Sequence, residues 1–324
     1  MKKNDKISVT SNNVKFYKHL EELSLLQKGI IKPVLLHLMP TTKCNLKCEN
    51  CCFAEVNAGK TQNLSLEIAK ETLLQFMMLG TKAVELTGFG DVTCYPYINE
   101  LIDFAHTQGF HIGMNTNGFL GKKIVGWDKF DWVRLSMNTL DFYPINKAYP
   151  IEYIRKKAPN LRLSGCYVNT SKVEETMPKI LEFANTHKIP VRIVPNCIET
   201  AKKITEQIKY LKTLIPKGEK YVFVSDFNIE LGKRRNNKCH LHLVKPALAP
   251  DGYVYSCPSS ELALENGTKL NKDFRICKGT EVFEYYSKGK AYNIPKHNCS
   301  YCKYKNFNEI LEDVLTESEF NEFT

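Results

Sequence analysis

The most constraining feature of this 324-residue chain is an alternation of short β-rich runs with amphipathic helical stretches between about residues 34 and 196. The expected strands are Val34–Leu38, Ala83–Thr87, Phe110–Asn115, Trp132–Ser136, Leu161–Val168 and Val191–Val194. The helices expected between them include Ser65–Leu79, Tyr97–Gln108 and Val173–His187. Repeated strand-then-helix units require parallel strands joined by right-handed crossovers. The sequence therefore predicts an α/β fold, an open sheet or a partial barrel, with its chemistry at the carboxyl ends of the strands.

Composition indicates a protein outside the membrane. Hydrophobic residues make up 43% and charged residues 25% of the chain, which is ordinary for a globular protein. No apolar run reaches the roughly 18–20 residues that a membrane span needs, and the basic start Met1–Lys6 leads into polar residues rather than a signal core. We expect a cytoplasmic location. In that reducing compartment the 12 cysteines are thiols, metal ligands or catalytic groups rather than disulfides.

Three cysteines directly after the first expected strand form the first patterned group. Cys44, Cys48 and Cys51 lie within Met39–Cys52, with three and then two residues between them. This spacing lets one loop wrap around a four-iron cluster and leaves the fourth iron without a protein ligand. The alternative is zinc, which normally takes four ligands. Cys52 could be offered as the fourth, but adjacent residues rarely converge on one metal.

The stretch Thr41–Cys48 and the third cysteine closely resemble the signature of the radical S-adenosylmethionine (SAM) superfamily. The resemblance implies a [4Fe–4S] cluster held by Cys44, Cys48 and Cys51. It also implies that the amino and carboxylate groups of SAM chelate the open iron. One departure is Asn50, where many members have an aromatic residue that packs near the adenine.

Three later strand ends resemble SAM-binding motifs of the same superfamily. Leu86–Thr93 resembles the Gly-Gly-Glu motif, with Asp91 standing for the usual glutamate. Asn115–Gly118 resembles a turn common in the superfamily, and Arg134–Asn138 resembles its serine-containing strand, without the usual aspartate after the serine. The SAM contacts that the resemblance implies are Thr87, Gly88, Phe89, Gly90, Asp91, Asn115, Ser136 and Asn138.

A second cysteine group lies in the C-terminal third. Its members are Cys239, Cys257, Cys299 and Cys302. Pro250–Pro258 predicts a tight hairpin that carries Cys257 at its exit. The spacing resembles the first half of the SPASM extension of radical SAM enzymes. Since the cysteines expected after Cys302 are missing, the match is to the truncated Twitch version, which holds one auxiliary [4Fe–4S] cluster. A four-cysteine zinc site has compatible spacing and stays open.

The remaining cysteines and two histidines receive plainer predictions. Cys277 is an alternative ligand, and His240 and His242 are expected to be packing or surface residues. Cys94 follows the Asp91 motif and could face the site. The cysteines expected to be buried as small hydrophobic side chains are Cys52, Cys94, Cys166 and Cys197.

Together these resemblances imply a partial (β/α)6 TIM-like barrel with a small C-terminal α+β Twitch domain. The expected segments are an N-terminal extension 1–33, the radical SAM barrel 34–200, a helical or strand linker 201–236, the Twitch domain 237–302 and an acidic helix or tail 303–324. The last segment has an apolar stripe that predicts a helix docked on the body. Its members are Phe307, Ile310, Leu311, Val314 and Leu315.

The resemblance implies an enzyme that reductively cleaves SAM to a 5′-deoxyadenosyl radical and then abstracts hydrogen from a substrate carbon. The auxiliary cluster would assist oxidation or substrate binding, and a flavodoxin or ferredoxin would donate electrons. Three substrate classes remain: a small molecule such as a sugar or nucleotide, which we place first, a ribosomally made peptide, or nucleic acid. The roughly 33 residues before the barrel are short for the leader-binding domain of many peptide-modifying members.

The net charge of +10 permits an anionic substrate. Nucleic acid is supported only by this charge and is not favoured, since a run of basic residues is usually a solvated face. An iron–sulfur or zinc regulatory protein is the non-enzymatic alternative. It needs neither an open three-cysteine site nor the glycine-acid motif beside it.

Overall fold

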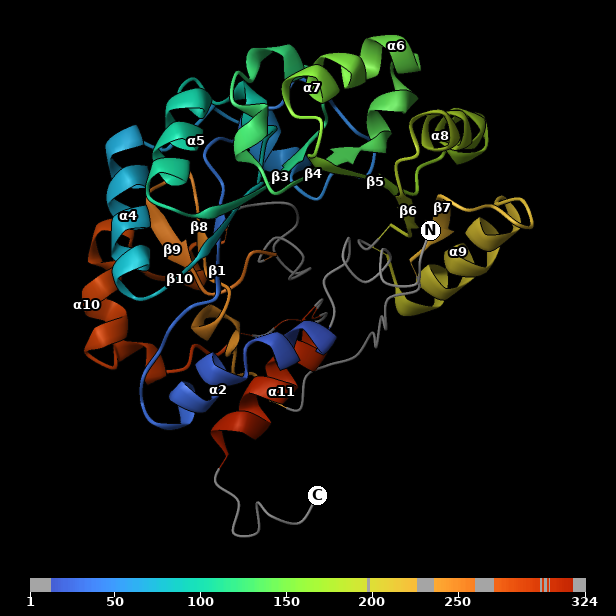
Figure 1. Ribbon diagram of the computed structural model, residues 1–324. Coiled ribbons are helices and arrows are strands. Elements are labelled where there is room, and N and C mark those ends of the chain that lie inside the picture. The colour runs from blue at the N-terminus through green and yellow to red at the C-terminus, as the bar shows by residue number, and fades with distance from the viewer. Residues whose placement is uncertain are drawn as a thin grey trace.

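The computed structural model describes residues 13–196, 199–225, 236–259, 271–297, 299, 302 and 304–316 (Figure 1). Its frame is one ten-stranded sheet in the order β10-β9-β8-β1-β2-β3-β4-β5-β6-β7. Neighbouring strands from β8 through β1 to β7 are parallel, and β9 and β10 are antiparallel additions at one edge. The strands are β1 (Leu35–Leu38), β2 (Ala83–Leu86), β3 (His111–Thr116), β4 (Trp132–Ser136), β5 (Arg162–Val168), β6 (Val191–Val194), β7 (Val222–Val224), β8 (Ala247–Leu248), β9 (Tyr253–Tyr255) and β10 (Arg275–Lys278).

All six expected strands are present in the expected parallel arrangement, so the predicted α/β partial barrel is confirmed. Two short parallel strands are additional. β7 comes from the region expected to be a linker, and β8 joins the predicted hairpin directly to β1. The division of the chain into domains stays a prediction, but strands from three of the expected segments share this one sheet.

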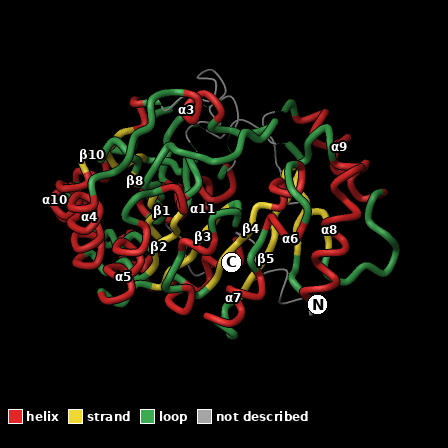
Figure 2. Tube along the Cα trace, turned by 90° about the horizontal axis from the view of Figure 1, so that it is seen from above, coloured by secondary structure: helices red, strands yellow, loops and turns green. Residues whose placement is uncertain are grey.

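Helices cover the outer side of the curved sheet, as Figure 2 shows from above. They are α4 (Leu66–Met78), α5 (Ile98–Thr107), α6 (Ile145–Ala148), α7 (Ile151–Lys157), α8 (Val173–His187), α9 (Ala201–Thr213) and α10 (Val282–Ser287), with α3 (Ala54–Ala58) in the loop after β1. Strand residues on this side, such as Leu36, Val84 and Ile112, are fully or almost fully buried. The strand alternation places polar side chains on the inner side instead. Register pairs Glu85 with His37 there and Asn115 with Arg134.

Two helices pack at the amino ends of the strands. α11 (Lys305–Leu315) lies beside α2 (Leu20–Gln27), below the sheet in Figure 1. Phe16 of the turn before α2 packs on Phe307, with ring centroids 4.9 Å apart, and the Tyr292 hydroxyl donates to the Leu26 carbonyl at 2.9 Å. Leu311 is fully buried. The predicted docking of the C-terminal helix is therefore confirmed.

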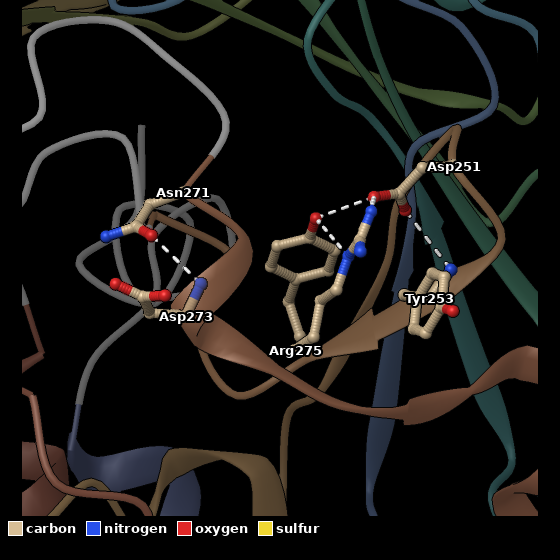
Figure 3. Close-up of polar contacts among 6 residues, drawn as sticks. Asp251, Tyr253, Asn271, Asp273 and Arg275 are labelled. Carbon is tan, nitrogen blue, oxygen red and sulfur yellow. Dashed lines mark hydrogen bonds and ion pairs between the residues drawn. The ribbon is translucent and has the colours of Figure 1, made fainter.

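The predicted hairpin is also present. Gly252 has a φ of +80° at its turn, a conformation that favours glycine. Arg275 of β10 forms an ion pair with Asp251 at 2.5 Å, and Asp251 also accepts a hydrogen bond from the Tyr255 hydroxyl at 2.7 Å (Figure 3). The Arg275 guanidinium lies 4.0 Å from the centre of the Tyr253 ring. These contacts tie β10 to the hairpin, whose strand β9 ends two residues before Cys257.

Among the residues that the structure describes, no helix is both long and apolar enough to cross a membrane.

Candidate functional site

The first cysteine group lies in the loop between β1 and α3, at the carboxyl end of β1. Burial, followed by the neighbouring Cys51 and Cys44 thiols, raises the pKa of Cys48 to about 12. The three sulfurs therefore gather in one partly enclosed place. Amide donors point at two of them: Leu46 N–H donates to Cys44 Sγ at 3.5 Å, and the Asn57 side chain donates to Cys51 Sγ at 3.5 Å. Crowded thiolates with amide donors fit an iron–sulfur cluster, whose cationic iron offsets their mutual repulsion.

Among the described residues, no three His, Cys, Asp or Glu side chains lie close enough together to hold a single metal ion. A four-iron cluster does not require that geometry, because each cysteine binds a different iron atom.

The glycine-acid segment after β2 packs directly on the cysteine loop. Gly90 N–H donates to the Thr41 carbonyl at 2.9 Å, and Asp91 N–H donates to the Lys43 carbonyl at 3.0 Å. A Cβ at Gly90 would lie 2.1 Å from the Lys43 oxygen. Gly88 has a φ of +144°, and a Cβ there would lie 2.8 Å from Met39 Cβ. Both glycines are therefore required by close backbone approach.

The Asp91 carboxylate is 6% exposed and is engaged by its own protein. It accepts from Thr93 N–H at 2.9 Å, from the Thr93 hydroxyl, and from the Thr116 hydroxyl at 3.0 Å. It also accepts from Asn117 N–H at 2.5 Å. In this arrangement Asp91 joins the glycine segment to the turn after β3. Its predicted contact with SAM stays a prediction.

Asn117 is a site residue that the sequence analysis did not single out. Its amide donates to Asn45 Oδ1 at 2.8 Å and approaches Cys44 Sγ at 3.9 Å. The signal that could have identified it is the turn Asn115–Gly118 itself, whose second asparagine is the one that faces the cysteine loop.

Two further contacts hold the loop from the β5 side. The Asn50 amide donates to the Asn169 carbonyl at 2.7 Å, and the Ser171 hydroxyl donates to the Glu49 carboxylate at 2.6 Å. Asn50 stands where an aromatic side chain is usual, and here it fastens the loop to the end of β5.

The other predicted SAM contacts lie along the inner edge of the sheet. Asn115 donates to Glu85 at 2.6 Å and to the Thr87 hydroxyl at 3.2 Å. Asn138 is 4% exposed and exchanges hydrogen bonds with the Val168 backbone, at 2.8 and 2.9 Å. Phe89 is 4% exposed, and its ring meets Phe53 edge-on at 4.7 Å. Ser136 ends β4 and is partly exposed.

The inner face also carries the charges of the site. Burial alone would raise the pKa of Glu85, but nearby His37, Lys245 and Arg134, together with the Asn115 amide, lower it to about 2. The Glu85 carboxylate lies 3.4 Å from His37 Nε2, and its side chain is 13% exposed. Glu85 is therefore ionised at neutral pH.

The second cysteine group is gathered by contacts between distant parts of the chain. Lys238 pairs with Lys296 in an antiparallel bridge, which brings Cys239 beside the segment that leads to Cys299. Cys239 Sγ lies 4.0 Å from the carbonyl of Ser256, the neighbour of Cys257. Asn308 of α11 links the rest of the group. Its amide donates to Cys302 Sγ at 3.7 Å, and its oxygen accepts from His240 N–H at 2.7 Å.

Cys277 and His242 are further candidate residues in this part of the chain. Burial, followed by Glu281, raises the pKa of Cys277 to about 12, and burial, followed by the Cys277 thiol, raises the pKa values of Tyr285 and Tyr286 of α10. His242 is fully buried, and its ring contacts the carbonyls of Cys239 and Ala291 at 3.1 and 2.9 Å, as a packing residue would.

The prediction that the remaining cysteines are buried is wrong for the three that the structure describes. Cys52, Cys94 and Cys166 are partly exposed. Cys52 lies on the cysteine loop, the Cys94 thiol contacts Asn45 of that loop, and Cys166 lies on the inner face of β5. Cys197 lies outside the described residues.

The two cysteine groups share one small apolar cluster. Met39 and Phe89 from the first site pack with Tyr255 and Phe274 from the hairpin region, and Cys257 and Cys299 border the same cluster. One apolar cluster therefore extends from the segments that flank the first cysteine group to the second group, and β8 joins the two regions through its pairing with β1.

Comparison with known proteins gives a consistent result. The Radical SAM superfamily model matches residues 38–171. The antilisterial bacteriocin subtilosin biosynthesis protein AlbA of Bacillus subtilis (strain 168) is 23% identical over 188 residues, which cover 58% of this chain and 38% of that protein. The chain thus matches about two fifths of the length of this curated relative.

Two solved structures have similar folds. Streptococcus suis SuiB bound to the precursor peptide SuiA has a TM-score of 0.53 and 16% identity, covering 85% of this chain and 70% of that one. The protein anSMEcpe with bound AdoMet and the Cp18Cys peptide has a TM-score of 0.51 and 14% identity, covering 90% and 86%. The family match lies on the segment that holds the first cysteine loop and the parallel strands β2 to β5, and this segment is similar to the radical SAM superfamily.

Proposed function

We propose that this enzyme modifies a peptide through a SAM-derived radical, with an auxiliary iron–sulfur cluster beside the active site. The observation that supports the proposal is one apolar cluster that extends between the surroundings of the two cysteine groups. Met39 and Phe89, from the segments around the first group, pack in the same cluster as Tyr255, and Cys257 and Cys299 of the second group border that cluster.

The peptide substrate is supported by the named relatives. SuiB was solved with a precursor peptide and anSMEcpe with a peptide and AdoMet, and AlbA serves bacteriocin biosynthesis. These relatives favour the peptide over the small molecule that the sequence analysis placed first. Nucleic acid receives no support from them.

A cluster at the first site would supply the electron for reductive cleavage of SAM, and this would provide the radical chemistry that removes hydrogen from the substrate. Cys44, Cys48 and Cys51 would hold that cluster. Gly88 and Gly90 keep the neighbouring backbone close to the loop. Fixing the reacting groups in this way removes much of the entropic cost of bringing them together.

The chain's other residues position and shield the site. Asn117 and Asn50 fasten the loop from the β3 and β5 sides. Phe53 and Phe89 place an apolar surface between the loop and the hairpin region. An apolar surface excludes water, which protects a radical from side reactions.

Cys239, Cys257, Cys299 and Cys302 would hold the auxiliary cluster. We assign it to substrate oxidation or substrate binding. A flavodoxin or ferredoxin is the proposed electron donor, and the cytosol the proposed location.

The test is anaerobic reconstitution with iron and sulfide, followed by dithionite, SAM and candidate peptides, with 5′-deoxyadenosine as the readout. We expect about eight irons per chain in the wild type and about four in the Cys44/Cys48/Cys51→Ala variant. We also expect a peptide to stimulate 5′-deoxyadenosine formation in the wild type alone. Zinc in place of iron, or an iron-loaded enzyme that never cleaves SAM with any peptide, would overturn the proposal.

A further inference from the structure

We propose that Asn57 of α3 is a positioning residue that makes the first site easier to reduce, because its side-chain amide donates a hydrogen bond to the sulfur of Cys51. The inference rests on the function proposed above, since it requires an iron–sulfur cluster on Cys44, Cys48 and Cys51. It adds a residue outside the cysteines that tunes the reduction on which SAM cleavage depends.

The contact joins a side chain of α3 to one of the predicted cluster ligands. Asn57 Nδ2 lies 3.5 Å from Cys51 Sγ. Asn117 also faces the first cysteine group, but its amide lies 3.9 Å from Cys44 Sγ and donates to Asn45 Oδ1 at 2.8 Å. Of these two side-chain amides, Asn57 therefore makes the closer approach to a cysteine sulfur.

The sulfur determines which way the Asn57 amide points. Asn57 Oδ1 is buried and accepts no hydrogen bond from the residues that the structure describes. Turning the amide over would direct this oxygen at Cys51 Sγ. A cysteine that binds iron is a thiolate, which accepts hydrogen bonds and has no proton to donate, so two acceptors would then face each other. The amide nitrogen must therefore point at the sulfur once iron is bound.

Backbone and packing contacts hold Asn57 beside Cys51. Ala54 N–H donates to the Cys51 carbonyl at 3.1 Å, and Asn57 N–H donates to the Phe53 carbonyl at 2.9 Å, so the turn that carries Asn57 starts from the cysteine itself. Phe53 and Val56 of the same turn pack against the apolar cluster that extends between the two cysteine groups. A donor that is already in place needs little reorganisation when the charge on the sulfur changes.

A donor in this position favours the reduced state. Reduction brings one electron to the site and makes the cysteine sulfurs more negative, and hydrogen bonds to the sulfurs are among the factors that set the reduction potential of a cluster. A hydrogen bond strengthens as its acceptor becomes more negative. The Asn57 amide therefore raises the reduction potential. The electron comes from the proposed flavodoxin or ferredoxin and is passed on to SAM.

The test is a redox titration of the reconstituted holoenzyme, followed by electron paramagnetic resonance. The signal that changes when SAM is added identifies the first site, and midpoint potentials are then compared without SAM. Asn57→Leu keeps a side chain of similar size but removes the donor, so we expect its midpoint to be more negative. The ratio of reduced to oxidised first site at a given solution potential should fall severalfold to about tenfold, and tenfold is about 59 mV for a one-electron couple.

Two further variants separate tuning from structural damage. Asn185→Leu removes a partly buried amide of the outer helix α8, which donates to the Leu181 carbonyl and to Glu219, and it should leave the midpoint unchanged. Asn57→Asp keeps the shape of the side chain but replaces the donor with a carboxylate, which is ionised at about pH 8. Its midpoint should also become more negative. Iron content and melting temperature show whether each variant is loaded and folded.

Three results would overturn the inference. One is a wild-type midpoint in iron-loaded Asn57→Leu, and another is an equal shift in Asn185→Leu. The third is loss of iron from the first site in both Asn57 variants, which would assign Asn57 to holding the cysteine loop in place. If Asn57→Leu alone loses iron, Asn57→Asp decides the matter.

The failure of the proposed function looks different, because the titration uses neither a peptide nor SAM cleavage. In that case the iron-loaded wild type would form no 5′-deoxyadenosine with any peptide, whatever the midpoints of the wild type and the Asn57 variants.

Discussion

Asp91 illustrates how one buried carboxylate can connect the separate parts of a site. It caps the short turn Val92–Cys94 and holds Thr116 and Asn117 of the neighbouring strand end. Asn117 in turn reaches Asn45 on the cysteine loop. A buried acceptor that loses its place leaves several donors unsatisfied, so the loop's position depends on this group.

We expect Asp91→Ala to lose about 1–3 kcal/mol of stability, because buried donors lose their acceptor. We also expect it to retain less iron at the first site. Iron content, melting temperature and SAM binding by dialysis check this. The control Asp103→Ala removes an exposed carboxylate that pairs with Lys129, and should keep its iron. Full iron content with a selective loss of SAM affinity would instead assign Asp91 to the SAM amino group.

Glu85 gives a prediction about pH. Its folded-state pKa of about 2 lies below the ordinary value of 4.5. The ionised group therefore contributes stability above pH 4.5, and this contribution is lost as the pH falls toward 2. A shift of this size corresponds to about 3 kcal/mol.

We expect Glu85→Gln to be less stable than the wild type at neutral pH, and the difference to shrink as the pH falls from about 4.5 to 2. Denaturant unfolding of the iron-free chain measures this without acid release of iron. His111→Gln is the control, because its ring contacts Asp131 at an exposed position. A gap that stays constant with pH would show that Glu85 contributes through packing instead.

At the scale of elements, hydrophobic periodicity predicted the strands and helices that have enough residues to display it. β4, α8 and β6 have the predicted bounds. β7 and β8 were missed because three and two residues are too short to show a period. The sequence also did not reveal that Asn117 contacts the cysteine loop or that Cys166 lies on the inner face of the sheet. Those contacts depend on strand register, which is set by the packing of the whole sheet.

Backbone approach between two elements supports a further prediction. Gly90→Ala would place a methyl group 2.1 Å from the Lys43 carbonyl oxygen, so the segment after β2 must move away from the cysteine loop. We expect loss of iron from the first site with the helix content retained. Gly59→Ala is the matched control, because its φ is −78° and its nearest contact would be 3.5 Å. Iron analysis and circular dichroism check both variants, and an iron-replete Gly90→Ala protein would contradict the expectation.

At the scale of the whole molecule, one sheet contains strands from the segments that were predicted to be the barrel, the linker and the Twitch domain. β8 pairs with β1 on one side and with β9 on the other, so the hairpin that leads to Cys257 continues the barrel sheet. α11 packs against α2 and also supplies Asn308 to the second cysteine group. Contacts that connect α2 and α11, far apart in the sequence, to one core favour a single cooperative unit.

We therefore expect one unfolding transition for the holoenzyme, with coincident midpoints for far-UV circular dichroism and visible cluster absorbance. Arg275→Met breaks the ion pair with Asp251 and the contact with Tyr253. If the sheet is one cooperative unit, this variant should lower both midpoints together, although the change lies in the hairpin region. Lys278→Met is the control, because its ion pair with Glu281 is exposed. Two separate transitions, with only the cluster absorbance shifted by Arg275→Met, would show that the hairpin region unfolds as a separate domain. The predicted boundary near residue 237 would then describe stability as well as sequence.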